Sequence, residues 1–91
     1  MTDTPRIKMF GTAGCPYCLA ARMLLKKKSL AFEDVAVDGD YELRKEMENL
    51  SGRWTVPQIF IDEKPIGGFE ELYALDSSGE LDRLLGIDTG P

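Results

Sequence analysis

The pattern of apolar and polar side chains predicts four strands. Apolar runs at residues 6–10, 32–37 and 56–61 are short, and a fourth run begins at Pro65 and ends at a pair of glycines. The second run alternates with acidic side chains near its start, which is typical of a half-buried strand. Residues 62–64, Asp-Glu-Lys, separate the last two runs and predict a tight reversal, so these two strands form a hairpin.

Apolar side chains at helical spacing predict four helices between and after these strands. The first spans residues 16–28, and the second lies between Asp40, its expected N-cap, and Ser51. Ser77 with Glu80 predicts a capping box for the short last helix. The apolar positions that define the helices are Cys18, Ala21 and Leu25; Leu43, Met47 and Leu50; Phe69, Leu72 and Leu75; and Leu81, Leu84 and Leu85.

The predicted order of elements is βαβαββαα, which indicates an α/β fold with one four-stranded mixed sheet. The first two strands are parallel because a helix crosses between them, and the last two are antiparallel. Helices cover both faces of the sheet. We expect a single domain over residues 1–91, with an ordered core at about residues 6–86 and a loose tail from Gly86 to Pro91.

Composition excludes several classes of function. The formal net charge is −5, so there is no electrostatic case for binding nucleic acid or an anionic membrane. The three lysines at residues 26–28 close the first helix, where they complement its dipole. No stretch approaches the length of a membrane span, and the polar, acidic N-terminus is unlike a secretory signal. We therefore expect a cytoplasmic protein, and we expect it to act as a monomer.

The two cysteines of the chain, Cys15 and Cys18, lie at the junction between the first strand and the first helix. A Cys-x-x-Cys pair in this setting is typical of a thiol–disulfide redox centre. Cys15 is at the helix start, where free N–H groups and the helix dipole stabilise a thiolate, whereas Cys18 is one turn further on the apolar face. We therefore expect Cys15 to attack a disulfide and Cys18 to resolve the mixed disulfide.

The chain has no histidine, which excludes Cys–His nucleophilic catalysis and histidine metal ligation. Two other interpretations of the cysteine pair are inert buried cysteines and half of a zinc site. An ordinary zinc site needs four ligands, commonly Cys or His, and the chain offers no others of these types. We therefore expect no metal site.

Two further segments are candidates for substrate binding. Pro57 is either an edge-strand residue or part of an exposed segment in which the Val56 backbone pairs with an extended, peptide-like thiol. The glycine pair at residues 67–68 is either a plain turn or the start of a helix whose N-terminus holds a carboxylate. In the turn that follows, Glu70 and Glu71 either compensate the helix dipole or meet a ligand ammonium.

The order and spacing of three motifs resemble the glutaredoxins, particularly the bacterial dithiol members of the glutaredoxin 3 type. The motifs are Cys-Pro-Tyr-Cys at residues 15–18, Thr-Val-Pro at residues 55–57, and Gly-Gly followed by acidic residues from Gly67. The resemblance covers nearly the whole chain. It implies a thioredoxin-like fold, a cis peptide bond before Pro57, and a thiol–disulfide oxidoreductase that uses glutathione as co-substrate without a tightly bound cofactor.

The same resemblance implies roles for individual residues. Cys15 forms the mixed disulfide with glutathione, and Cys18 resolves protein disulfides, so the expected substrates are protein disulfides and glutathionylated proteins. The glutathione-binding residues that it implies are Tyr17, which flanks the tripeptide; Thr55 and Val56, which hold its cysteinyl backbone, with Pro57 beside them; Phe69 and Glu70, at its γ-glutamyl end after Gly68; and Arg44, for its glycine carboxylate.

Two positions depart from the family pattern. Thr12 stands where many members carry lysine, which removes one positive charge near the Cys15 thiolate, and Glu70 stands where aspartate is usual. Two alternative functions stay open: an iron–sulfur carrier that dimerises through Cys15 and two glutathiones, and a redoxin reduced by thioredoxin reductase. Monothiol carriers of the first type resemble this chain less, because they carry Cys-Gly-Phe-Ser. Redoxins of the second type lack the usual Thr-Val-Pro and Gly-Gly glutathione site.

Overall fold

The computed structural model describes residues 5–86, and within them the elements follow the predicted order βαβαββαα. The strands are β1 (Ile7–Gly11), β2 (Phe32–Ala36), β3 (Gln58–Ile61) and β4 (Lys64–Gly67). The helices are α1 (Pro16–Lys27), α2 (Tyr41–Ser51), α3 (Phe69–Ser77) and α4 (Glu80–Leu85). The predicted loose tail lies outside the described residues, apart from Gly86, which ends α4.

The strands form one mixed sheet, as predicted, and their order in it is β2-β1-β3-β4. β1 runs parallel to β2, with α1 as the crossover, and antiparallel to β3. β3 and β4 form the predicted hairpin, whose turn residues Asp62 and Glu63 have φ of 51° and 70°. Positive φ at both central residues matches the twist of paired strands, which explains the tight turn.

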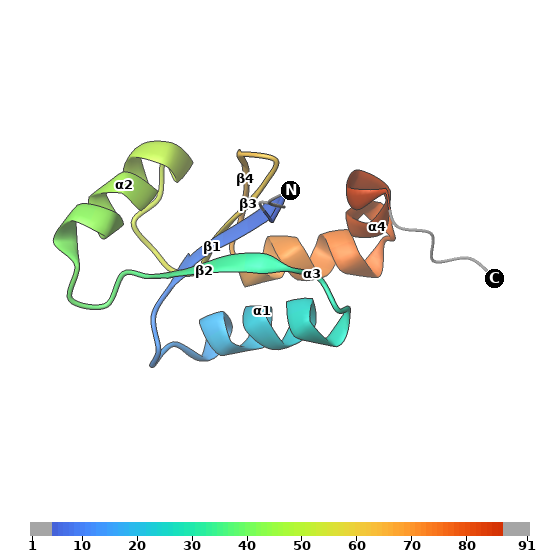
Figure 1. Cartoon of the computed structure of the whole chain (residues 1–91), viewed down its shortest axis with the longest axis horizontal. Helices are drawn as coiled ribbons and strands as arrows, with labels where there is room; N and C mark the ends of the chain where they lie inside the picture. The colour runs from blue at the N-terminus through green and yellow to red at the C-terminus, as the bar shows by residue number, and fades with distance from the viewer. Residues whose placement is uncertain (1–4, 87–91) are drawn as a thin grey trace.

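Side chains of β1 and β3 alternate between two separate apolar clusters. Ile7 and Met9 of β1, with Ile59 of β3, pack on one face against α1, α3 and α4. On the opposite face Phe10 meets Phe60 edge-on, with ring centroids 5.7 Å apart, beneath α2. Figure 1 shows α1 and α2 on opposite sides of the sheet, so helices cover both faces. Among residues 5–86, no helix is both long and apolar enough to cross a membrane.

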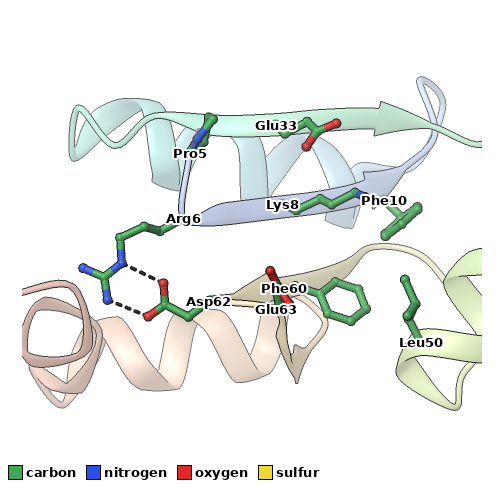
Figure 2. Close-up of a pocket in the computed structure, with 9 residues that line it drawn as sticks. All are labelled: Pro5, Arg6, Lys8, Phe10, Glu33, Leu50, Phe60, Asp62 and Glu63. Atoms are coloured by element: carbon green, nitrogen blue, oxygen red, sulfur yellow. Dashed lines mark hydrogen bonds and ion pairs between the residues drawn. The ribbon is translucent and has the colours of Figure 1, made fainter. Parts of the chain in front are cut away.

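The apolar face predicted for α2 is only partly buried. Met47, on the inner face of α2, is fully buried, whereas Leu50 keeps 52% of its surface exposed. Leu50 borders a cavity of about 550 Å³ on this face of the sheet (Figure 2). The Arg6–Asp62 ion pair lines the other end of the same cavity. The cavity therefore extends along the part of this sheet face that α2 leaves uncovered.

Helix ends agree with the prediction in one case and differ in another. The Asp40 carboxylate accepts the backbone N–H of Leu43 at 3.0 Å and so caps α2 as expected. The capping box predicted from Ser77 is wrong, because α3 continues through that residue. The N-cap of α4 is Gly79, with φ of 83°, a conformation that favours glycine.

Candidate active site

The two cysteines occupy different environments at the start of α1. Cys15 is the N-cap residue, with extended backbone, and Pro16 follows in the first turn, where a missing N–H costs nothing. The Cys15 side chain is half-buried, whereas Cys18 faces the core with no exposed surface. The two sulfurs therefore differ in burial because one helical turn separates the two residues.

Hydrogen bonds at the helix start favour the thiolate of Cys15. Desolvation alone would raise the pKa of this thiol, but four contributions oppose it. They are the backbone N–H and the thiol of Cys18, the backbone N–H of Tyr17, and the positive charge of Arg22. Together they outweigh desolvation and hold the pKa of Cys15 below its ordinary value.

Burial has the opposite result for Cys18. Desolvation raises the pKa of this thiol above its ordinary value, and the neighbouring Cys15 raises it further. The backbone N–H of Thr12 donates to the Cys18 sulfur at 3.4 Å and offsets part of that rise. The expected order of acidity, with Cys15 the more acidic thiol, therefore has a physical basis at both positions.

The loop before β3 forms a wall of the site beside Cys15. The Cys15 thiol donates to the carbonyl oxygen of Val56 across 3.9 Å, and the peptide bond between Val56 and Pro57 is cis, as the resemblance implied. Gln58, which is buried, donates its side-chain amide to the carbonyl oxygen of Thr55 at 2.9 Å. This contact holds the loop so that its backbone edge lies next to Cys15.

The glycine pair brings the start of α3 against that wall. A Cβ on Gly68 would lie 3.2 Å from the carbonyl oxygen of Pro57, so the close approach leaves little room for a side chain. Gly67 has φ of 115°, and a Cβ there would lie 2.8 Å from the side chain of Glu71. Position 67 therefore needs glycine, position 68 leaves little room for any side chain, and Gly68 and Phe69 at the N-terminus of α3 line the groove.

The two glutamates after the glycines have different environments. Glu71 accepts the backbone N–H of Gly68 at 2.7 Å, which holds the pKa of its carboxyl below the ordinary value. The Arg53 guanidinium lies 3.9 Å from the Glu71 carboxylate and lowers that pKa further. Glu70 is exposed on the rim of the groove. Of the two residues, Glu70 is therefore the one available to a ligand.

A groove of about 270 Å³ brings most of the expected binding residues together. It is lined by Tyr17, Thr55, Val56, Pro57, Gly68, Phe69 and Glu70, which were expected, by Glu71, which was the alternative to Glu70 at a ligand ammonium, and by Arg53 and Gln58, which were not expected. The sequence signals for the two missed residues are a basic residue two positions before Thr-Val-Pro for Arg53, and a polar residue opening an apolar strand for Gln58.

Arg44 is the expected binding residue that does not line the groove. Its Nε and Nη2 atoms donate to the carbonyl oxygen of Trp54 at 3.2 and 3.0 Å, and its guanidinium stacks 5.2 Å from the Trp54 ring centroid. Arg44 therefore fixes the loop that leads into the groove. In residues 5–86 no three His, Cys, Asp or Glu side chains are grouped as metal ligands would be.

Comparison with known proteins places this arrangement in a family. Residues 7–66 match the family model described as Glutaredoxin. The chain is 48% identical to glutaredoxin 3 of Escherichia coli over 79 residues, which cover 87% of this chain and 95% of the relative. Two solved structures share its thioredoxin-like fold.

The first is a dithiolic glutaredoxin from Trypanosoma brucei, which has a TM-score of 0.80 and 37% identity and covers 89% of this chain and 87% of its own. The second is a buckwheat glutaredoxin solved with glutathione, which has a TM-score of 0.81 and 22% identity and covers 90% and 77%. The second likeness concerns the fold alone. On the family match and the identity to its bacterial relative, the chain belongs to the glutaredoxin family of thiol–disulfide oxidoreductases.

Proposed function

We propose that this oxidoreductase reduces protein disulfides and glutathione mixed disulfides, with glutathione as co-substrate and the Cys15–Cys18 dithiol as the reacting group. One observation carries the proposal: a groove beside Cys15 joins an exposed backbone edge to a helix N-terminus. A γ-glutamyl tripeptide has a backbone to pair with the first and a carboxylate for the second. The buckwheat glutaredoxin solved with glutathione has the same fold.

The chemistry consists of thiol–disulfide exchanges. The Cys15 thiolate attacks one sulfur of a protein disulfide, a Cys15–substrate disulfide forms, and the other substrate sulfur leaves as a thiolate. Cys18 then attacks the Cys15 sulfur, which releases the second substrate thiolate and leaves a Cys15–Cys18 disulfide. Two glutathione molecules reduce this disulfide and become glutathione disulfide. With a glutathionylated protein, Cys15 takes the glutathione, and a second glutathione regenerates the thiol without Cys18.

The groove suggests how each part of glutathione binds. Its cysteinyl backbone pairs with Val56, next to Thr55 and cis-Pro57. Its γ-glutamyl carboxylate accepts hydrogen bonds from the free backbone N–H groups in the first turn of α3, which begins at Phe69 directly after Gly68. The exposed carboxylate of Glu70 meets the ammonium group. Tyr17, which is 59% exposed, offers its ring as a side wall.

The glycine carboxylate of glutathione has two candidate partners. Arg44 is the one that the family resemblance implies, but its guanidinium is occupied by the Trp54 carbonyl and ring. Arg53 lines the groove and has a half-exposed side chain. We therefore assign the main contact to Arg53 and a supporting role to Arg44, which holds the loop.

A charge reversal at Glu70 tests this arrangement. Glu70→Lys puts a cation beside the glutathione ammonium, which should raise the KM for glutathione several-fold at low salt and less at high salt. Turnover with 2-mercaptoethanol, which has no ammonium, should barely change. Glu42→Lys is the matched control, because Glu42 occupies the first turn of α2 and does not line the groove. Equal losses with both thiols would refute the γ-glutamyl assignment.

We also propose that the protein acts as a monomer in the cytoplasm. A catalytic dithiol that cycles through a transient disulfide is typical of a reducing compartment. Each groove wall comes from one copy of the chain, so the proposed chemistry needs no second subunit. Sedimentation of the reduced protein with and without glutathione tests the monomer, and a stable dimer in either state would contradict it.

A further inference from the structure

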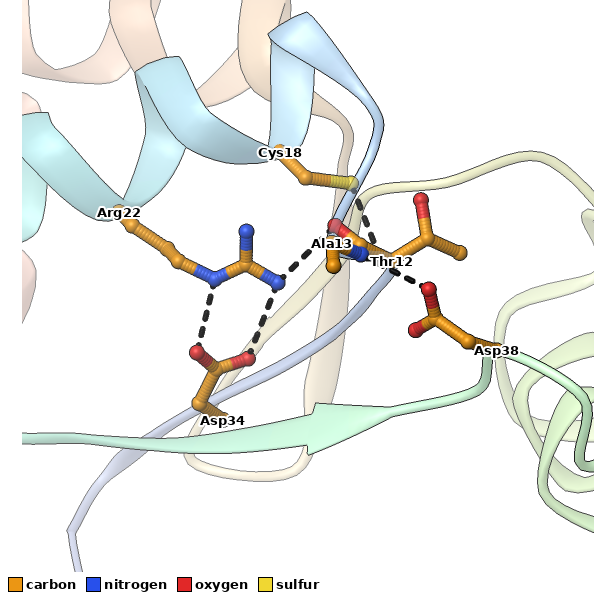
Figure 3. A network of polar contacts seen from close by, with 6 residues as sticks. All are labelled: Thr12, Ala13, Cys18, Arg22, Asp34 and Asp38. Atoms are coloured by element: carbon orange, nitrogen blue, oxygen red, sulfur yellow. Dashed lines mark hydrogen bonds and ion pairs between the residues drawn. The ribbon is translucent and has the colours of Figure 1, made fainter.

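Arg22 is a half-buried cation next to the cysteine pair, and its only role in the proposed exchanges is to lower the pKa of Cys15. Its side chain keeps only 16% of its surface exposed and points from α1 toward the end of β1. Its Nε donates to Asp34 of β2 at 2.8 Å, and its Nη2 donates to the carbonyl oxygen of Thr12 at 3.2 Å (Figure 3). The guanidinium therefore ties the loop before the cysteines to the neighbouring strand.

The same loop contacts the sulfur of Cys18. The backbone N–H of Thr12 donates to that sulfur at 3.4 Å, while the Thr12 carbonyl accepts from Arg22 (Figure 3). A Cβ on Gly11 would lie 3.0 Å from the Cys18 sulfur and 3.2 Å from the Arg22 Nη2 atom. Both atoms thus border the space that the glycine leaves empty, and the Arg22 charge interacts with the Cys18 thiolate.

We propose that Arg22 is a positioning residue for Cys18, which holds the Thr12 N–H on the sulfur and supplies positive charge when Cys18 becomes the attacking thiolate. The inference rests on the proposed dithiol function. In the step concerned, the Cys18 thiol gives its proton to solvent and attacks the Cys15 sulfur of a mixed disulfide. The Cys15–Cys18 bond forms, the bond to the substrate sulfur breaks, and the substrate leaves as a thiolate.

The Cys18 thiolate needs a stabilising charge because the free N–H groups at the start of α1 do not stabilise it. The free N–H groups of a helix lie in its first turn, where they favour the Cys15 thiolate, and burial disfavours a charged Cys18. Cys15 on α1 acts on the Cys18 sulfur, Arg22 on the same helix interacts with the Cys18 thiolate, and the carboxylates of Asp34 and Asp38 face the Arg22 guanidinium. Arg22 is the cation in this set, and α3 contributes the apolar Leu72 to the same cluster.

The size of the effect follows from thiol chemistry. If loss of the cation raises the pKa of Cys18 by about one unit, about tenfold less thiolate is present near neutral pH. A more basic thiolate is also a better nucleophile, which returns about threefold of that loss. We therefore expect the resolving step to slow about threefold near neutral pH and its pH midpoint to rise by about one unit.

Stopped-flow reaction with the aromatic disulfide dithiobis(nitrobenzoate) isolates the step without glutathione. Cys15 attacks first and releases one coloured nitrothiophenolate, and Cys18 then displaces the second from the mixed disulfide. Arg22→Met should slow the second release and raise its pH midpoint, with a smaller effect on the first. Arg22→Lys keeps a cation, so the pH midpoint of its second release should stay close to that of the parent protein. Because no glutathione is present, this result is independent of the proposed glutathione site.

Arg6→Met is the matched control. Arg6 makes a similar two-point contact with Asp62, at 2.7 and 2.6 Å, at the far end of the β1–β3 pair from the cysteines. The Arg6→Met variant should leave the rate and pH midpoint of both nitrothiophenolate releases unchanged. An unaltered midpoint in Arg22→Met, or equal slowing of both releases, would overturn the proposal. If Arg22→Met fails to fold, Arg22→Gln against Arg22→Lys decides, because only the lysine should keep the parent midpoint.

Discussion

Substitution of Gly67 by alanine should reveal how the start of α3 is held against the groove. The new Cβ would lie 2.8 Å from three atoms of the Glu71 side chain, which must therefore move. That movement breaks the bond from the Gly68 N–H to the Glu71 carboxylate, now 2.7 Å long. Alanine must also adopt φ of 115°, which L residues rarely do.

The expected loss of stability has two parts. A non-glycine residue in such a conformation costs about 1–3 kcal/mol. Loss of a capping contact costs about 1 kcal/mol. Gly67→Ala should therefore lower the free energy of unfolding by about 2–4 kcal/mol, and each kcal/mol should lower Tm by about 4–8 °C in a domain of this size.

A double-mutant cycle separates the two parts. Glu71→Ala alone removes the capping contact and should cost about 1 kcal/mol. In the Gly67→Ala/Glu71→Ala variant that contact is lost only once, so the double variant should lose about 1 kcal/mol less than the sum of the single losses. Urea denaturation of the reduced proteins measures all three. Additive losses, within about 0.3 kcal/mol, would show that Gly67 is not required because of Glu71.

Three further predictions concern the site. Cys15→Ser should abolish activity, whereas Cys18→Ser should keep reduction of glutathione mixed disulfides and lose most reduction of protein disulfides; parallel losses of both activities in Cys18→Ser would contradict the assigned roles. Arg53→Met should raise the KM for glutathione more than Arg44→Met does, as steady-state kinetics would show, and the reverse order would favour Arg44. The pKa of Glu71 is lowered by the Gly68 N–H, so its contribution to stability is present at neutral pH and is lost as pH falls below about 4. The stability difference between parent and Glu71→Gln should shrink over that range, and a constant difference would refute the linkage.

Periodicity was sufficient to predict the element order, because each strand and helix contributes apolar side chains at its own repeat. The exposed Leu50 shows the limit of the method, since the spacing of α2 does not reveal how much of the sheet the helix covers. The false capping box at Ser77 has a similar origin. Its sequence fits a cap, but α3 extends through Ser77, and Gly79 starts the next helix with positive φ.

The candidate site also contains some residues that the sequence predicts and others that it does not. Cys15 and Cys18 were predictable from spacing alone, since one helical turn sets their different burial. Arg53 joins the groove only because the loop before β3 folds against the start of α3. The contact between Arg22 and Asp34 depends on the register of β1 with β2 and on the rotation of α1, neither of which a single sequence specifies.

The choice of electron donor distinguishes a glutathione-dependent oxidoreductase from a redoxin. The reduced protein, a protein disulfide substrate and NADPH are combined either with glutathione and glutathione reductase or with thioredoxin reductase alone. If glutathione is the co-substrate, turnover should be sustained with the first system, saturating with glutathione, and should be low with the second. Turnover with thioredoxin reductase that equals or exceeds the glutathione-dependent rate would contradict the proposed co-substrate and favour a redoxin.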